Sequence, residues 1–179
     1  VKSLESLYPG IPSIGCIGMG YDTRIVEKGV AVIAFSDGVS AAANVLEQIS
    51  VMPVKYISRL EQDIARVGGT NQNTVCIDFC SGNDACVLTT IYSVLKNKGI
   101  QLVGGTGDGG RVSANGRVYQ DAAAYGIIRN QGGRVKTYKE NIYHQYGDYR
   151  FIASNTDRAK YIIGSLNGIP AKKVYEDIL

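Results

Sequence analysis

The sequence predicts an α/β domain of the mixed α+β kind, with βαβ units, a mixed sheet and a β-rich C-terminal third. Isoleucine (19) and valine (17) far outnumber leucine (9), and β-branched side chains suit the pleated surface of a sheet. A strand, a helix and a second strand follow one another with short connections in the middle of the chain. Glycine is frequent, at 22 of 179 residues, which indicates tight turns and close approaches of the backbone.

The central βαβ unit has the clearest pattern. Thr74–Cys80 is a short apolar run between polar segments, as expected for a buried strand. Asp84–Lys98 carries apolar residues at helical spacing and is followed by Gly99, which ends the predicted helix. The apolar positions of this helix are Val87, Ile91, Val94 and Leu95. Residues 100–104 form the second strand, and the right-handed crossover rule predicts that it runs parallel to the first.

The segments before this unit predict two strands and a helix. Residues 30–35 (VAVIAF) are continuously apolar, which favours a strand. Residues 39–49 fit either a strand or a short helix. A helix is predicted from about residue 54 to residue 67, and the glycine pair at 68–69 ends it.

The segments after the unit predict mostly strands. The Asn-Gly pair at 115–116 is a strong hairpin signal between residues 111–113 and 117–119. Residues 122–129 form a further apolar strand. Tyrosines alternate with charged residues over 138–149, which is typical of half-exposed antiparallel strands.

The last residues of the chain predict a hairpin and a helix. The hairpin joins residues 149–154 to 160–163, and Pro170 is expected to begin the helix. The helix reaches the end of the sequence with an apolar stripe of Val174, Ile178 and Leu179. That stripe predicts self-association, such as a homodimer, through this end of the chain.

The two halves of the chain show a possible internal duplication. Residues 14–20 align with residues 103–109 at a constant offset, so that three glycines match in each copy. An apolar segment follows both copies, and the repeats span about 1–70 and 71–165. The first repeat lacks the equivalent of its first strand, so we expect a single domain over 1–179 that is truncated at both ends.

Composition and motifs exclude several classes of function. Four cysteines without framework spacing favour a reduced, cytoplasmic protein. A net charge of +3 with evenly mixed signs gives little attraction to nucleic acid, and no apolar stretch is long enough to span a membrane. The glycine pattern that begins at Gly105 leads into a hairpin rather than a helix, which argues against a dinucleotide site. We therefore expect no cofactor, no metal, no nucleic acid and no membrane partner.

The two glycine-rich segments are the remaining candidate site. Bare backbone N–H groups at the carboxyl ends of strands can bind an anionic group. Asp108 could take an ammonium group, and Thr106 or Tyr125 could donate hydrogen bonds. The predicted ligand-binding residues are Gly15, Cys16, Gly18, Met19, Gly20, Gly104, Gly105, Thr106, Gly107, Asp108, Gly109 and Tyr125. The alternative is that the glycines serve only turns and close packing.

Three classes of function stay open on the residues alone. The first is a non-enzymatic input module that binds a small polar metabolite. The second is an enzyme that acts on a small substrate through Asp78, Asp108 or Cys16. The third is a structural or dimerising lobe.

Four segments of the chain resemble the N-terminal half of the FIST sensory domain family. They are residues 14–20 (IGCIGMG), residues 30–38 with their terminal Asp-Gly, residues 102–109 (LVGGTGDG) and residues 166–175 (LNGIPAKKVY). The resemblance implies a bacterial signal-transduction module that works with a FIST C-terminal half. It also implies attachment to output domains such as chemotaxis transducers, histidine kinases or cyclic-dinucleotide enzymes. Small ligands such as amino acids are the implied signal, and no catalytic residue comes with the resemblance.

Overall fold

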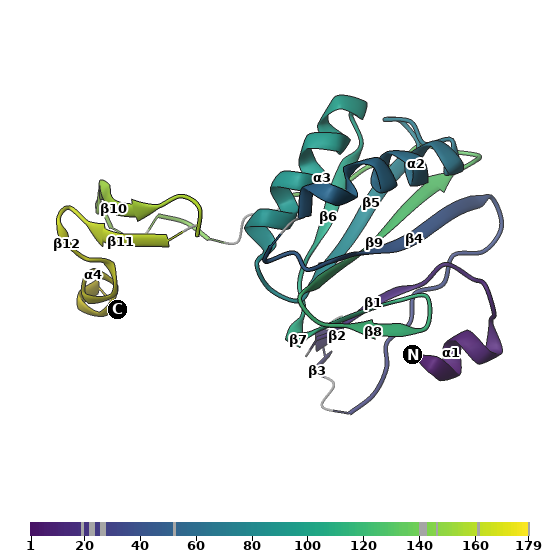
Figure 1. The fold of residues 1–179 in the computed structure, drawn as a ribbon, viewed down its shortest axis with the longest axis horizontal. Helices are drawn as coiled ribbons and strands as arrows, with labels where there is room; N and C mark the ends of the chain where they lie inside the picture. Colours follow the sequence, from purple (N-terminus) through teal and green to yellow (C-terminus); the bar gives the residue numbers. More distant parts are fainter. Residues whose placement is uncertain are drawn as a thin grey trace. The chain divides into compact units, whose positions relative to one another are not determined.

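The computed structural model describes residues 1–18, 20–21, 24–25, 28–51, 53–139, 143–145, 147–160 and 162–178. The chain divides into two compact units, Val1–Thr137 and Tyr138–Leu179. The larger unit contains a central sheet, helices on one face of that sheet and a second small sheet on the other face (Figure 1).

The central sheet is mixed, as the sequence predicts. Its four strands lie in the order β4 (Val39–Glu47), β9 (Ala122–Asn130), β5 (Thr74–Cys80) and β6 (Gln101–Thr106). The strands β4, β9 and β5 pair antiparallel, while β5 and β6 pair parallel. The helix between the parallel strands, α3 (Asp84–Lys98), has the predicted bounds, and Gly99 ends it in the left-handed conformation. The predicted βαβ unit is therefore confirmed.

The helices α2 (Ile57–Val67) and α3 cover one face of this sheet (Figure 1). A short 3-10 helix, η1 (Pro53–Tyr56), precedes α2, so the α-helix begins three residues later than predicted. Buried apolar side chains from both helices and from the strands form the main core, with Leu46, Leu60, Ile64, Ile91, Leu95 and Ile127 among the largest. Gly68 ends α2 in the left-handed conformation, as the glycine pair predicts.

The opposite face of the central sheet packs against a smaller sheet with the order β1 (Ile14–Ile17), β7 (Asp108–Ala114), β8 (Arg117–Tyr119). The strands β7 and β8 form the hairpin that the Asn-Gly pair predicts, with Ala114 opposite Arg117. The N-terminal helix α1 (Lys2–Leu7) precedes β1, and the two-residue strands β2 (Gly20–Tyr21) and β3 (Arg24–Ile25) follow it.

The central sheet is covered on both faces, and this explains why residues 39–47 form a strand rather than a helix. Within β4, Ala42 and Leu46 pack into the main core under the helices, whereas Val45 packs into the second cluster under the small sheet. A strand presents successive side chains to opposite faces, so it can fill both cores at once. All nine residues of β4 are register partners of β9.

Two predicted strand regions of the sequence are not strands. Residues 29–36 contain no helix or strand, and Val30, Ile33 and Phe35 are exposed, so the predicted strand at 30–35 is wrong. An apolar run forms a strand only where a neighbour accepts its backbone hydrogen bonds, and this run has no register partner among the described residues. The described residues of 138–149 likewise form no strand. Because residues 30–35 are not a strand, the predicted internal duplication lacks the strand that was expected to follow its first glycine-rich segment.

The smaller unit is a three-stranded meander with a terminal helix. Its strands are β10 (Ala153–Asp157), β11 (Ile162–Leu166) and β12 (Ile169–Pro170), all antiparallel, and α4 spans Ala171–Ile178. The predicted hairpin exists, but β10 includes residues 155–157, where the sequence predicts the turn, so the turn lies further along the chain. Val174 is buried within this unit, which corrects its assignment to an uncovered stripe, while Leu179 lies outside the described residues.

Candidate functional site

A pocket lies at the carboxyl end of the parallel pair β5 and β6, beside the first turn of α3. Its cavity volume is about 310 Å³, and its lining residues are Asp78, Asp84, Leu88, Leu102, Gly104 and Gly105. The carboxyl ends of parallel strands are where open α/β sheets bind small ligands, because the connections to the helices diverge there. The βαβ unit therefore positions the pocket.

Asp78 is the buried acid of this pocket. The side chain lies on β5 with 3% of its surface exposed. The pKa of its carboxyl is raised to about 6. Burial is the main cause, a hydrogen bond from its own backbone N–H opposes it, and the charge of Asp84 adds to it. No other described residue donates a hydrogen bond to this carboxyl. At neutral pH the pocket therefore holds a negative charge that lacks a protein donor beyond its own amide.

Gly104 makes room for that carboxyl. It is the register partner of Asp78 across the parallel pair, and its φ is +152°. A Cβ at this position would overlap the carbonyl oxygen and a carboxylate oxygen of Asp78. Only glycine combines this backbone conformation with the missing side chain.

Asp84 supplies the second carboxylate, from the first residue of α3. Its side chain is exposed at the mouth of the pocket, and Thr106 Oγ1 donates a hydrogen bond to Asp84 Oδ2 at 3.3 Å. The preceding residue, Asn83, has φ +51° and does not cap the helix with its side chain. The carboxylate lies at the N-terminal end of α3, where the partial positive charge of the helix macrodipole attracts anions.

The two thiols nearest Asp78 on the same strand are held in the protonated form. Burial raises the pKa of Cys76 strongly, and the charge of Asp78 adds to this effect. Burial also raises the pKa of Cys80 to about 11, and its Sγ donates to the carbonyl of Gly82 at 3.3 Å. Neither thiol is poised as a nucleophile at neutral pH, because a nucleophilic cysteine requires the thiolate.

The two glycine-rich segments meet, but as paired strands of the small sheet. Cys16 is the register partner of Val112, and Ile17 is the partner of Asp108, with a bulge between them. A Cβ at Gly107 would lie 2.7 Å from Cys16 Cβ. The glycines here permit close contact between the two segments, and residues 108–114 are extended strand.

The predicted site residues therefore separate into groups. Gly104 and Gly105 line the pocket and Thr106 contacts its rim, whereas Gly15, Cys16, Gly107, Asp108 and Gly109 lie in or beside the small sheet. Gly18 is exposed and Gly20 belongs to β2, while Met19 lies outside the described residues. Partial burial and the charge of Asp108 raise the pKa of Cys16.

Tyr125 is fully buried under α2. Its hydroxyl donates to Asp63 Oδ2 at 2.7 Å, and Asn44 and Arg66 also contact the Asp63 carboxylate. The backbone of Tyr125 is the register partner of Asp78. Its hydroxyl, however, is bound to the helix α2, so this tyrosine joins the sheet to the helix.

Sequence reasoning missed three residues of the pocket: Asp84, Leu88 and Leu102. A signal for Asp84 was available, because it is an acid in the short connection after a strand, at the start of a predicted helix. No local signal identifies the two leucines, since they read as ordinary apolar positions of a helix and a strand.

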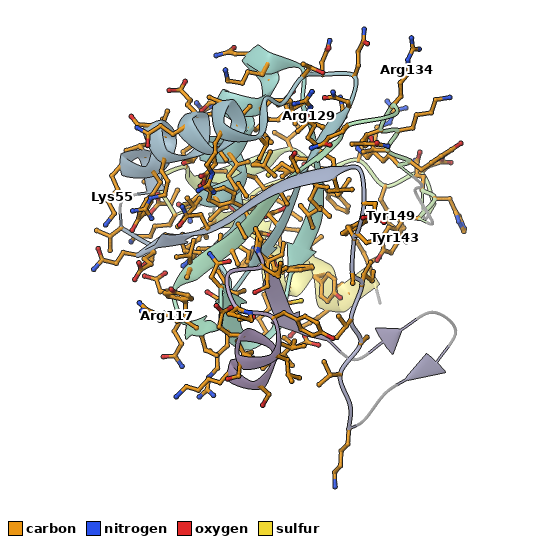
Figure 2. The ribbon with its side chains drawn as sticks, turned by 90° about the vertical axis from the view of Figure 1, so that its right-hand side faces the viewer. Lys55, Arg117, Arg129, Arg134, Tyr143 and Tyr149 are labelled. Atoms are coloured by element: carbon orange, nitrogen blue, oxygen red, sulfur yellow. The ribbon has the colours of Figure 1, made fainter. Side chains whose placement is uncertain are left out.

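The basic side chains of the larger unit are spread apart. Figure 2 shows Lys55, Arg117 and Arg134 at separate places on the surface. Arg129 instead donates to the carbonyl of Val67 at the end of α2 at 3.1 Å. None of the six residues that line the pocket carries a positive charge.

The part of the chain that the structure describes lacks two features. Within that part of the chain, no three histidine, cysteine or acidic side chains gather as a metal site. No helix there has the length and apolar content that crossing a membrane requires.

Comparison with known proteins identifies a family. The model of the FIST N domain matches residues 1–169 of the 179. A search of curated proteins finds no match. FIST domains are sensory domains of signal-transduction proteins. Since the match covers nearly the whole chain, this chain belongs to the FIST N domain family.

Proposed function

We propose that this chain binds a small polar metabolite in the pocket at the carboxyl ends of β5 and β6. The observation that carries the proposal is the buried carboxyl of Asp78, which faces a cavity without a cationic partner. A buried charge without a counter-ion costs free energy, and proteins retain such groups chiefly at functional sites. A ligand that supplies donors would offset this cost.

The ligand is of the size of an amino acid. A cavity of about 310 Å³ lies at the lower end of the range for small-molecule sites, which begins at about 300 Å³. We propose a non-enzymatic, cytoplasmic input module of a bacterial signalling protein, of which chemotaxis transducers are one type. Its partners would be a FIST C-terminal half and an output domain.

The test is a thermal-shift screen of amino acids, amines, small carboxylates and sugars against the chain. A ligand at 100 times its Kd adds about 2.7 kcal/mol of stability. The matched variants are Leu88→Trp, which fills the pocket from α3, and Leu88→Met, which preserves side-chain volume. We expect hits that Leu88→Trp abolishes and Leu88→Met retains. Hits that persist in Leu88→Trp would move the site elsewhere, and a screen without hits would refute ligand binding by this chain.

An enzyme is the second candidate, and one observation favours it. A carboxyl whose pKa is about 6 can act as a general acid or base near neutral pH. The two candidates differ in the fate of the ligand. We expect a bound compound to be recovered unchanged after prolonged incubation with the protein, whereas chemical conversion that Asp78→Asn abolishes would establish the enzyme.

A further inference from the structure

We infer that the pocket recognises the primary ammonium group of an aliphatic amine, held between the carboxylates of Asp78 and Asp84. This inference rests on the proposed function and specifies the chemical class of its ligand. Three features of the pocket support it: its charge, the unfilled hydrogen-bonding capacity of its two acids and the apolar walls beside them.

The charge of the pocket selects a cation. Its lining contains two carboxylates, two leucines and two glycines, with no basic side chain. Asp84 is among the causes that raise the pKa of Asp78, so the field of one acid reaches the other. A second anion in this cavity would add to the repulsion, whereas a cation would relieve it.

The hydrogen-bonding capacity of the two acids selects a donor with several N–H groups. Asp78 receives a hydrogen bond only from its own amide among the described residues, although an ionised carboxylate can accept about four. Asp84 receives one on Oδ2 from Thr106, and no described residue donates to its Oδ1. A primary ammonium carries three donors and no acceptor. It can therefore bind both carboxylates at once, which a hydroxyl with a single donor cannot.

The walls of the pocket favour an aliphatic stem on the amine. Leu88 of α3 and Leu102 of β6 both line the cavity, and Leu88 is 43% exposed. Methylene groups that cover Leu88 would remove apolar surface from water. An α-carboxylate directly beside the ammonium would instead lie close to the two acids. Amines without a neighbouring carboxylate should therefore bind more tightly than α-amino acids of the same length.

Binding of the amine should weaken in acid. The titratable groups around Asp78 are Asp84 from α3, Cys76 and Cys80 on its own strand, and its register partner Tyr125 on β9. The raised pKa values of the two thiols and the phenol keep them neutral, so the carboxyls control the charge. Protonation of Asp78 below pH 6 removes an acceptor and a charge from the site. Affinity should then fall towards tenfold for each pH unit.

The experiment is titration calorimetry of the whole chain with n-butylamine, n-butyrate and n-butanol at pH 7.5 and at pH 5. These probes share a four-carbon stem and differ in the polar group. We expect heat of binding for butylamine at pH 7.5, weaker binding at pH 5 and none for butyrate. Equal binding of butanol or butyrate would overturn the inference.

Three variants locate the ammonium. Asp78→Asn and Asp84→Asn should each weaken butylamine binding about tenfold or more, the loss expected for a charged hydrogen bond. Asp37→Asn, which removes an exposed carboxylate from outside the pocket, is the control and should bind as the unmodified chain does. Melting curves show whether each variant is folded. Unchanged affinity in folded Asp78→Asn would refute the inference.

A fourth variant tests the same point without removing an acid. Leu88→Lys places an ammonium one helical turn after Asp84, at the wall of the pocket. We expect it to compete with the added amine and abolish butylamine binding, while Leu88→Met retains it. If screened compounds other than amines bind and Leu88→Trp blocks them, only the ammonium inference fails. If no compound binds, the proposed function fails with it.

Discussion

The two glycine-rich segments of the larger unit look alike in sequence, but their glycines have different structural roles. In residues 14–17, glycine lets β1 lie directly against β7: a Cβ at Gly15 would be 2.9 Å from Ser113 Oγ. In residues 101–106, Gly104 instead leaves space for the carbonyl oxygen and a carboxylate oxygen of Asp78. The first case makes room for a side chain of the paired strand, and the second makes room for the acid that lines the pocket. A shared glycine pattern thus indicates missing side chains without saying what takes their place.

Among the substitutions that test this comparison, we expect Gly104→Ala to change the free energy of unfolding most. Gly104→Ala should lower the free energy of unfolding by about 3 kcal/mol or more, because the strained φ and the overlap with Asp78 add together. Gly18→Ala is the matched control, since a Cβ there meets nothing within 4 Å. Urea denaturation of both variants measures the difference. Equal stability would mean that β6 shifts freely and that Asp78 is not held against it.

A smaller effect is expected where the two segments touch. Gly107→Ala should cost about 2 kcal/mol, since its Cβ would lie too close to Cys16 Cβ and the strands on either side of Gly107 hold it in place. In a Cys16→Gly background, the closest clash disappears and the cost should fall by about half. A double-mutant cycle in urea measures this coupling. If the two substitutions are additive, the contact between the segments does not limit the packing.

The smallest and most conditional effect concerns pH. The pKa of Asp78 is raised from 3.8 in the unfolded chain to about 6 in the folded one, so the folded state binds this proton more tightly. Its contribution to stability is full below pH 3.8 and is lost as the pH rises through 6. Asp78→Asn should therefore stabilise the protein by on the order of 2 kcal/mol at pH 7.5 and hardly at all at pH 4.

Melting temperatures across this pH range, with Asp37→Asn as control, test the sign of that effect. The difference between Asp78→Asn and the unmodified chain should grow between pH 4 and pH 6 and then level off. A variant that is less stable at pH 7.5 would show that the ionised carboxyl is already well satisfied in the ligand-free protein. Such a result would also remove the main argument for the pocket.

The βαβ unit could be predicted closely because its signals are local. Helical spacing, a strand of seven residues and the terminal Gly99 all act within a few residues of the backbone that they specify. The apolar run at 30–35 misled because periodicity does not reveal whether a neighbouring strand exists. The pocket depends on the parallel register that sets Asp78 beside Gly104. That register exists only in the folded sheet. The sequence therefore suggested Asp78 as a catalytic residue and Gly104 as a ligand-binding residue, without indicating that the two are neighbours.

Tyr125 was predicted to donate a hydrogen bond to a ligand, but its hydroxyl donates to Asp63 instead. The reason is again a contact between distant parts of the chain. A tyrosine in an apolar strand needs a partner for its hydroxyl, and the sequence alone offers many. The structure supplies Asp63, which is 62 residues away and on a different element. Long-range partners of this kind follow from the packing of α2 on the sheet.

Three consecutive residues join the pocket to the rest of the larger unit. Thr106 bonds to Asp84, the amide of Gly107 donates to the carbonyl of Cys80 at 2.8 Å, and Asp108 is paired with Ile17. The chain leaves one sheet and enters the other with a single residue between them. Such a connection has no slack, and close-packed interiors transmit displacement rather than absorb it. A movement of Asp84 would therefore shift β7 and, with it, the small sheet.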